Sequence, residues 1–535
     1  MSLPPLTLQM TMDQALRRVT THRPGQEALI CGDVRLTYGQ LQERIDRTAN
    51  FLAHRGVGKG DRVMLMLPPG VDYIVLFFAV AQRGAVVVPI DPTQRAQRVL
   101  QIASQVAPAR LVVAEPLPEE VSGGLPAGIE VHLTDEFLPE RIPDLPLIPA
   151  PEVSPTDLLA ILYTSGTTGV PKGAMHTHRS LIAPVVASLK LRELWIKRPS
   201  LVQLPKMGRA LLRYKQRLLR AAGRPQIFLS TTGYHNTTGI EVFLQALLMG
   251  DTLVIQPYFN PVEALELIQR ERVTVLVAVP TALAVMLRVE NFDQYDLSSL
   301  LICGTGAAPC PPDLAREIQR RFGCALHIGF GATEIGGGVA APHIGDSPEV
   351  QAETVGRPMP GVEIRIVDEQ GNPLPPGQVG ELWVRGEGVM LGYWGAPDLT
   401  EQVLDAEGWY RTGDMAVMDE RGYLRIVGRK KDMIIRGGRN IFPEEIERHL
   451  VTHPRVREAA VVGVPGRFGD EEIWAFVIPE PGHSLTPQEV REHCRGALEP
   501  YQIPQVVRIV EDFPRASTGK PQKFRLRELA MQERE

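Results

Sequence analysis

Residues 159–173 of this 535-residue chain read LAILYTSGTTGVPKG, an apolar segment followed by a loop of glycine, serine and threonine that ends in a lysine. The apolar segment predicts a buried strand. Glycines let the backbone approach a polyphosphate, successive N–H groups form a nest for an anion, and hydroxyls with Lys172 complete the cradle. The loop is not a Walker A motif, because Gly173 follows Lys172. The alternative is a flexible solvent loop, but such linkers rarely follow an apolar strand in this way.

On both sides of this segment, short apolar runs alternate with amphipathic helical stretches. Strands that alternate with helices predict βαβ units and largely parallel sheets. The apolar runs are 62–67, 85–90, 110–113, 252–255 and 274–279, and helical spacing is clear at 38–52 and 261–270. We therefore predict an α/β fold, with a large N-terminal domain of parallel α/β layers over residues 1–428.

The pattern changes after about Met359. Strands separated by Gly, Pro and Asp turns indicate a β subdomain within the large domain. They are expected at 361–367, 380–385 and 422–427. A run of charge then predicts a hinge at 429–432, followed by a small mobile α+β domain at 433–535. Its expected elements are a helix at 443–452, strands at 457–464 and 472–479, a helix at 486–498, a strand at 505–510, and a loop.

Composition narrows the class of protein. The 57 Lys and Arg residues nearly balance 62 Asp and Glu, for a formal net charge of -5, so global basicity gives no reason to expect nucleic acid as the partner. Five scattered cysteines without a C-x-x-C pair argue against a structural zinc site and a disulfide framework. Residues 1–10 lack the features of a secretory signal, and the longest apolar run, 74–81, is too short to span a bilayer. We expect a soluble cytoplasmic protein.

Taken whole, residues 159–173 resemble the phosphate-binding motif of the adenylate-forming superfamily, which comprises acyl-CoA synthetases, the adenylation domains of peptide synthetases, and luciferases. Four further motifs follow in the family's order. They are FGATE at 330–334, GWYRTGD at 408–414, GRKKD at 428–432 and STGK at 517–520. With LTYGQL at 36–41, the resemblance covers nearly the whole chain and is closest to the acyl-CoA ligases.

The resemblance implies ATP and CoA as substrates and Mg²⁺ as cofactor. A carboxylate oxygen would attack the α-phosphorus of ATP, expelling pyrophosphate and leaving an acyl-adenylate, which the CoA thiol then attacks to form the acyl-CoA thioester and release AMP. Negative charge gathers on the α-phosphate in the first half, so cations and oriented donors are needed there. Lys520 resembles the family's catalytic lysine, Thr333 its α-phosphate donor and Glu334 its Mg²⁺ ligand.

The same resemblance implies a set of nucleotide- and CoA-binding residues. The phosphates would be held by Thr164, Ser165, Gly166, Thr167, Thr168, Gly169 and Lys172, adenine by Phe330, Gly331, Gly306 and Ala307, the ribose by Asp414 and Arg429, and pantetheine by Gly437 and Gly438. Lys431 aligns with the pivot about which the family's C-terminal domain rotates, which would remove Lys520 from the site and bring in residues 436–441.

Each assignment has a structural alternative. Lys520 could be a surface lysine, Glu334 a turn or cap residue, and 304–309 a plain strand-to-helix turn. His235 lies where acyl and aryl ligases often place a histidine beside the carboxylate, but the usual proline and aromatic lead-in is absent, so a structural histidine is an alternative. Phe330 stands where many members carry tyrosine.

Three rival functions remain. A stand-alone adenylation enzyme that loads a carrier protein would share every ATP motif, a luciferase would need a particular luciferin, and a catalytically inactive binding protein should lack Lys520 or Glu334. Glu241 is the only acid near His235, so a partner for an α-amino group is not evident. Mixed, small and apolar pocket candidates favour a fatty or aromatic acid. They are Tyr234, Thr237 and Ile240.

Residues 197–224 depart from the family pattern, with nine basic residues and no acidic one. From Met207 onward the segment predicts a helix. Its apolar stripe is Met207, Leu211, Tyr214 and Leu218, widened by Leu212 and Leu219, and its basic face is Arg209, Arg213, Arg217, Arg220 and Arg224. A solvated surface helix is one interpretation. The other is that this basic helix, 207–224, recruits an anionic partner: a membrane surface, the CoA phosphates, or an acidic carrier protein.

Overall fold

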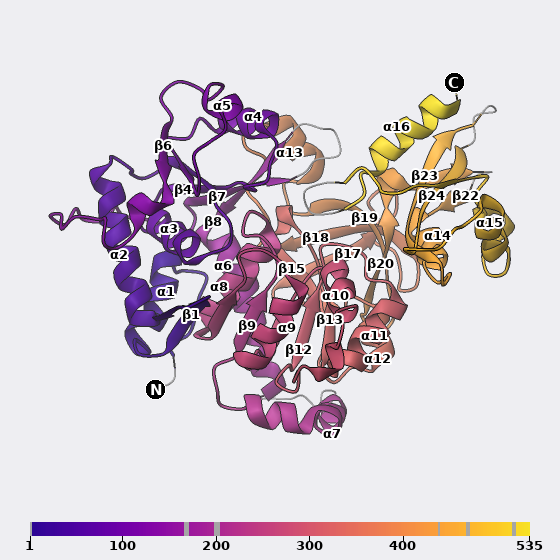
Figure 1. Ribbon diagram of the computed structural model, residues 1–535, viewed down its shortest axis with the longest axis horizontal. Helices are drawn as coiled ribbons and strands as arrows, with labels where there is room; N and C mark the ends of the chain where they lie inside the picture. Colours follow the sequence, from indigo (N-terminus) through magenta and orange to yellow (C-terminus); the bar gives the residue numbers. More distant parts are fainter. Residues whose placement is uncertain are drawn as a thin grey trace.

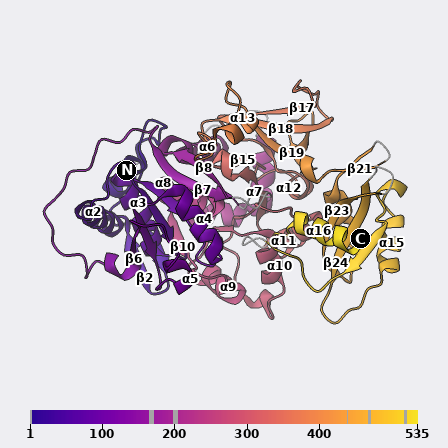
Figure 2. The ribbon, with the colours of Figure 1, turned by 90° about the horizontal axis from the view of Figure 1, so that it is seen from above.

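The computed structural model describes residues 3–164, 171–196, 204–436, 439–466, 471–515 and 520–534. The chain forms a large part, which runs to Arg429, and a smaller part beside it, which contains the C-terminus (Figure 1). Seen from above, the smaller part lies at one end of the long axis (Figure 2). The mixed α/β class with parallel layers, a β subdomain and a small C-terminal α+β unit is confirmed.

One sheet of the large part ends in the segment 159–173. Its order is β6-β5-β3-β4-β7-β8, parallel except for the antiparallel β7–β8 pair. The strands are β3 (Arg62–Met66), β4 (Val86–Pro89), β5 (Arg110–Val113), β6 (Glu130–Leu133), β7 (Leu158–Thr164) and β8 (Lys172–Thr177). The expected buried strand before the phosphate loop is therefore confirmed as β7.

A second sheet has the order β13-β12-β11-β9-β10-β1-β2, parallel except for the edge strand β2. Its strands are β1 (Glu27–Cys31), β2 (Val34–Thr37), β9 (Ile227–Ser230), β10 (Thr252–Ile255), β11 (Val275–Val277), β12 (Ile302–Thr305) and β13 (Ala325–Ile328). Parallel strands of this kind are covered by helices on both faces, which explains their nearly continuous burial.

Helices of the large part cover these sheets. They are α1 (Met12–His22), α2 (Tyr38–His54), α3 (Val71–Gln82), α4 (Ala96–Val106), α5 (Glu119–Ser122), α6 (His178–Ile196), α7 (Leu204–Ala221), α8 (Thr237–Met249), α9 (Pro261–Arg270), α10 (Pro280–Leu287), α11 (Pro312–Phe322), α12 (Pro348–Glu353) and α13 (Pro397–Val403), with 3₁₀ turns η1 (Thr134–Phe137) and η2 (Phe292–Gln294). α3 is apolar all round and buried, as expected of a core helix. Its Tyr73 and Phe77 rings meet Phe243 of α8 edge-on.

The β subdomain follows where it is expected. It consists of β14 (Phe330–Ala332), η3 (Thr333–Ile335), β15 (Gly337–Ala341), β16 (Arg357–Pro358), β17 (Val362–Val367), β18 (Val379–Gly386), β19 (Tyr410–Met418) and β20 (Leu424–Arg429). The last four form an antiparallel sheet in chain order. This sheet faces the smaller part and supplies one wall of the site.

The smaller part begins after the 3₁₀ turn η4 (Lys430–Asp432). Its elements are β21 (Ile434–Arg436), β22 (Arg439–Ile441), α14 (Pro443–Leu450), β23 (Val456–Pro465), β24 (Glu471–Pro479), α15 (Pro487–Arg495), η5 (Pro500–Gln502), β25 (Val506–Ile509) and α16 (Lys523–Arg534). The sequence predicted a loop where α16 lies, and that prediction was wrong. Only Leu526 and Ala530 of α16 are buried, against the β23–β24 sheet, so tertiary packing rather than a strong apolar pattern stabilises it.

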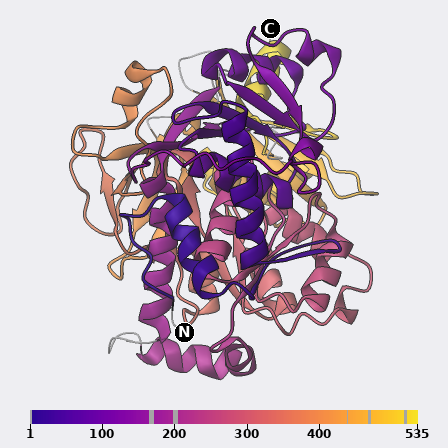
Figure 3. The ribbon, with the colours of Figure 1, turned by 90° about the vertical axis from the view of Figure 1, so that its left-hand side faces the viewer.

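α7 lies at the lower edge of the molecule, below the second sheet (Figures 1 and 3). The predicted helix is confirmed, but it starts at Leu204 and ends at Ala221, so Arg224 lies outside it, and residues 197–203 lie outside the described ranges. The predicted apolar stripe was partly wrong, because Leu211, Leu212 and Leu219 are exposed and Ala210, which was not in it, is buried. Tyr214 is buried as the stripe predicted. Tyr214 has non-helical φ and ψ, so the helical phase is not kept across it.

The segment has no acidic residue of its own, but one of its cations has a counter-charge from elsewhere in the chain. Lys206 Nζ pairs with Asp346 Oδ1 at 2.5 Å, and Arg217 donates hydrogen bonds to the carbonyls of Leu297, Leu300 and Phe322. Arg217 therefore belongs to the buried side of α7 and not to its solvent face. Among the described residues, no helix is both long enough and apolar enough to span a membrane.

Candidate active site

A cavity of about 2380 Å³ opens between the two parts of the chain and continues into the large part. Two of the three residues predicted for the acid pocket, Tyr234 and Ile240, are instead buried in the core and do not line this cavity, whereas Thr237 does. The cavity does gather every described residue that was predicted for catalysis, nucleotide binding or metal binding. These are Thr164, Lys172, His235, Gly306, Ala307, Phe330, Gly331, Thr333, Glu334, Asp414, Arg429, Lys431 and Lys520. Ser165, Gly166, Thr167, Thr168 and Gly169, with Gly437 and Gly438, lie outside the described residues.

The two ends of the predicted phosphate loop face each other. Thr164 at the end of β7 and Lys172 at the start of β8 are paired across the antiparallel ladder. Both residues lie on the cavity wall. The Lys172 ammonium lies 5.4 Å from the centre of the Tyr393 ring, which is within range of a cation–π contact.

Glu334 is held on the short turn η3 by contacts from distant segments. The Tyr393 hydroxyl donates a 2.9 Å hydrogen bond to Glu334 Oε1. His176 Nε2 lies 2.8 Å from the Thr333 carbonyl oxygen. Burial lowers the pKa of His176 to about 4, so the ring is neutral and Nε2 donates to that carbonyl. Tyr393 and His176 thus position the Thr333–Glu334 turn.

Asp414 and Arg429 are brought together by the β19–β20 ladder, in which they are direct partners. Arg429 Nε lies 3.2 Å from Asp414 Oδ1. Burial raises the pKa of Asp414, and the positive charges of Arg429 and Lys520 oppose that rise. An ionised carboxylate with two acceptor oxygens at this position suits a pair of neighbouring hydroxyls, as a ribose offers.

Lys520 comes from the smaller part and reaches the same group. Its pKa is lowered to about 8, first because the surrounding protein desolvates the ammonium and then because Arg429 repels it, while Asp414 opposes the shift. The ammonium therefore lies within electrostatic range of the carboxylate–arginine pair. In this conformation the C-terminal lysine is inside the cavity.

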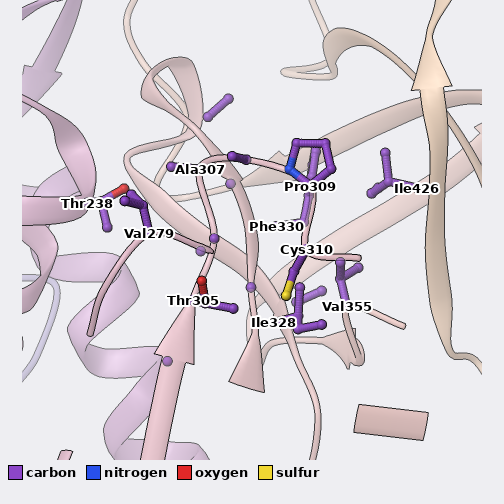
Figure 4. Close-up of a pocket in the computed structure, with 18 of the residues that line it drawn as sticks. Thr238, Val279, Thr305, Ala307, Pro309, Cys310, Ile328, Phe330, Val355 and Ile426 are labelled. Atoms are coloured by element: carbon purple, nitrogen blue, oxygen red, sulfur yellow. The ribbon is translucent and has the colours of Figure 1, made fainter. Parts of the chain in front are cut away.

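The wall expected to hold adenine is formed by the loop after β12 and by β14 (Figure 4). Ala307 has a φ of 61°, and a Cβ at Gly306 would lie 2.9 Å from the carbonyl oxygen of Gly329. A side chain at 306 would therefore collide with the neighbouring strand end. Phe330 is partly buried in this wall, with Pro309 and Ile426 beside the same space.

His235 has a carboxylate neighbour that sequence reasoning missed. Its Nε2 lies 3.6 Å from Oδ2 of Asp91, which follows β4. Burial lowers the pKa of His235, and Asp91 opposes that effect. The ring folds back over Gly233, where a Cβ would approach it to 2.5 Å. The geometry favours a histidine oriented toward the cavity over a purely structural one.

Sequence reasoning also missed Tyr393, Tyr410 and His176. Tyr410 carried a usable signal, since it lies inside the GWYRTGD motif, and it lines the cavity. Asp91 follows a buried parallel strand at its carboxyl end, which is where ligand-binding residues gather in α/β sheets. Tyr393 and His176 carried no local signal, because their partners are remote in the chain.

Arg436 and Arg439 flank the two glycines predicted to meet pantetheine, which lie outside the described residues. Arg436 donates a hydrogen bond to the Tyr501 carbonyl, and the Arg439 guanidinium lies 4.4 Å from the centre of the Tyr501 ring. Neither arginine is on the cavity wall. In this conformation Lys520 lines the cavity, and Arg436 and Arg439 do not.

The predicted metal ligand Glu334 is not part of a cluster of metal-binding side chains within the ranges that the structure describes. Among the described residues, no group of three or more His, Cys, Asp or Glu side chains could hold a metal. Mg²⁺ bound with substrate phosphates needs only one or two carboxylates, the rest being phosphate oxygens and water. Within the described part of the chain, Glu334 accepts a side-chain hydrogen bond from Tyr393 alone, so its carboxylate has further lone pairs for a metal ion and fits that requirement.

A large and a small part with a cavity between them, lined by the Asp414–Arg429 pair of the large part and Lys520 of the small one, form the architecture of an adenylate-forming enzyme. The chain belongs to the AMP-binding enzyme family: the model of that family matches residues 16–394, and the model of the AMP-binding enzyme C-terminal domain matches residues 445–520.

Similar proteins of named activity narrow the class of enzyme. It is 33% identical to the medium-chain acyl-CoA ligase ACSF2, mitochondrial, of Pongo abelii, over 97% of this chain and 87% of the relative. It is 34% identical to the feruloyl-CoA synthase of Amycolatopsis sp, over 94% of this chain and 96% of that one. The solved anthranilate CoA ligase AuaEII, in complex with anthranoyl-AMP, superposes with a TM-score of 0.85 at 26% identity, covering all of both chains. The protein is an AMP-forming acyl-CoA synthetase.

Proposed function

We propose that this protein joins a fatty or aromatic carboxylic acid to CoA, with Mg²⁺ as cofactor. The observation that carries the proposal is the meeting of Lys520, Asp414, Arg429 and Glu334 around one cavity whose deeper walls are largely apolar. The relatives named for medium-chain and feruloyl substrates span the same two classes of acid.

In the first half-reaction, the carboxylate oxygen bonds to the α-phosphorus and the bond to pyrophosphate breaks. Lys520 offers its ammonium to the α-phosphate and carboxylate oxygens, which orients the attack and offsets the developing charge. Asp414 accepts hydrogen bonds from the ribose, and Arg429 holds Asp414 in place. Bound Mg²⁺ would neutralise phosphate charge from Glu334. In the second half, the thiol sulfur bonds to the acyl carbon and AMP leaves.

The test is a pyrophosphate-release screen of acids that vary in length and aromaticity, run with and without CoA and with a carrier protein. We expect release with fatty or aromatic acids, and thioester only when CoA is added. A thioester that forms on carrier protein and not on CoA would support the rival adenylation enzyme. The absence of pyrophosphate release with every acid would overturn the proposal.

Glu334→Gln should raise the Mg²⁺ concentration needed for half-maximal adenylation and lower the rate, because the amide keeps the shape and loses the charge. Tyr393→Phe is the matched variant, since it removes the hydroxyl that holds Glu334 Oε1 and leaves the charge. It should lower the rate by less. The measurement is an Mg²⁺ titration of pyrophosphate release, and a titration unchanged in Glu334→Gln would exclude Glu334 as the ligand.

We also propose that α7 docks the protein on an anionic lipid surface. Leu212 is 88% exposed and Leu219 is 64% exposed, and exposed basic residues accompany them on the same helix. These are Arg209, Arg213, Lys215 and Arg220. Exposed leucines among cations favour a bilayer interface over a soluble anion such as the CoA phosphates. Met207, Ala210 and Leu218 of α7 line the active-site cavity, so an acid entering from the bilayer would have an apolar route inward.

Reversing Arg209, Arg213 and Lys215 to glutamate should weaken binding to phosphatidylserine vesicles by at least about 30-fold at low salt, since each cation contributes roughly 1 kcal/mol near an anionic surface. The effect should fade at high salt. Arg217 is left intact because it holds three backbone carbonyls. Arg320→Glu on α11, an exposed reversal elsewhere, serves as control. Unchanged vesicle sedimentation of the triple variant would rule out docking through α7.

A further inference from the structure

Helix α8 carries a polar stripe on the face that lines the cavity. Thr237, Glu241 and Gln245 recur every four residues, so they share one side of the helix, and all three line the cavity. The rest of α8 is mostly apolar and buried, through Ile240, Val242, Phe243, Leu244, Ala246, Leu247 and Leu248. The adenylation chemistry described above uses none of the three polar side chains.

The carboxylate of Glu241 is held by two hydrogen bonds and packs closely against a glycine. Its Oε1 accepts a 2.9 Å hydrogen bond from Gln245 Nε2, and its Oε2 accepts one of 3.1 Å from the backbone N–H of Gly338. Gly337 beside it has a φ of 150°, and a Cβ there would lie 2.8 Å from Glu241 Oε2. The glycine pair at the start of β15 therefore leaves room for this carboxylate against the strand that pairs with β14.

Glu241 has more acceptor capacity than the protein uses. A carboxylate offers about four lone-pair sites, and among the described residues two donors occupy two of them. Burial raises the pKa of Glu241 to about 7, and within the described ranges no cation is among the groups that oppose this. Its side chain keeps part of its surface open to the cavity. A charge left in this state is costly unless a ligand supplies a donor.

Thr237 provides a second, independent sign. It is 7% exposed, and its hydroxyl oxygen has no hydrogen-bond partner among the described residues. A buried hydroxyl without a partner costs free energy, so such groups in native proteins call for an explanation. Thr237 also lines the cavity, two residues after His235. A bound group could satisfy both Thr237 and Glu241.

We propose that Thr237, Glu241 and Gln245 form a subsite for a hydrogen-bond-donating substituent, a hydroxyl or amino group, on the carboxylic acid, away from its carboxylate. The inference rests on the proposed function and narrows its substrate class. Successive members of the stripe are about 6 Å apart along the helix, so the preferred position of the substituent reports which residue it meets. An acid lacking the donor would leave these groups unpaired, which is how polar sites reject apolar analogues.

The experiment compares matched acids in the pyrophosphate-release assay with the full-length protein. One series is hexanoic, octanoic and decanoic acid with their ω-hydroxy and ω-amino derivatives. The other is cinnamic acid with its meta-hydroxy, para-hydroxy and para-amino derivatives. We expect at least one substituted acid to exceed its parent in kcat/KM by about 10- to 100-fold, the effect of a hydrogen bond to a charged group. The hydroxy and amino arms identify the donor.

Glu241→Leu should bring this ratio close to one, by lowering kcat/KM for the substituted acid and raising it for the parent. Glu241→Gln should lower the ratio in part, and Thr237→Val, which removes only an unpartnered hydroxyl, tests the subsite if Glu241→Leu does not fold. Glu266→Leu, on the exposed side of α9, should leave the ratio unchanged.

The assay distinguishes loss of the subsite from loss of acid activation. Parent acids that are activated as well as every substituted acid would overturn the subsite and leave acid activation standing. A substituent preference that persists in Glu241→Leu and Thr237→Val would also overturn it. Failure of all acids, parent and substituted, would instead count against the proposed function itself.

Discussion

Replacing Lys520 with alanine should abolish acyl-adenylate formation and largely spare thioester formation from acyl-adenylate supplied ready-made. Lys520 is the cation that the smaller part brings to Asp414 and Arg429, and in the proposed reaction it would offset the charge that develops on the α-phosphate. Loss of one such donor lowers the rate by about 100- to 1000-fold. The second half-reaction would need the cavity to be rearranged, with residues 436–441 turned toward it and Lys520 withdrawn.

Single-turnover assays of the two half-reactions measure this directly. Arg525→Ala is the control, because Arg525 is exposed on α16 and is not on the cavity wall. Loss of both half-reactions by more than about 100-fold would contradict the use of separate conformations for the two steps.

The same lysine predicts how adenylation depends on pH. The ammonium is the active form, and its pKa is about 8, so the rate should fall as pH rises through 8 and recover when pH is lowered again. The residual rate of Lys520→Ala should show no such decline. A wild-type rate that stays flat to pH 10 would mean that Lys520 keeps its proton throughout, or does not act as a cation in this step.

Lys431→Pro should have the opposite effect: adenylation is retained and thioester formation falls by about 10-fold or more. Lys431 lies in the 3₁₀ turn η4 that joins β20 to the smaller part. Proline fixes φ near -65°, a value that a 3₁₀ turn accepts, so the present conformation should persist. A rotation of the smaller part about this residue would require φ and ψ to change, and proline prevents that change.

Lys431→Ala separates the backbone effect from the side chain, which lines the cavity. We expect the alanine variant to keep most of its thioester formation, because its backbone remains free. The measurement is the rate of acyl-CoA formation from ready-made acyl-adenylate. Undiminished CoA ligation by Lys431→Pro would show that the pivot lies elsewhere, and equal losses in both variants would assign the effect to the ammonium.

The sequence alone determined the α/β class, the β subdomain and the motif residues that line the cavity. The sequence also predicted the bounds of a helix where its start is marked by a capping residue. The helix α9 is Pro261–Arg270 as predicted, because Asn260 caps it and Pro261 is its first residue. Motif residues could be assigned because each motif is a short local pattern. Every described motif residue of the predicted site lies on the cavity wall for that reason, whereas Tyr234 and Ile240, predicted outside any motif, are in the core.

Only the tertiary structure decided which partners hold those residues. Tyr393 reaches Glu334 across 59 positions, His176 reaches Thr333 across 157, and Asp91 meets His235 from another sheet. It also decided the course of α7 across Tyr214, the formation of α16 and the seat of Glu241 between α8 and β15. Local patterns report the periodicity and chemistry of neighbouring residues, whereas these contacts depend on how separate elements pack, which no short stretch of the chain encodes.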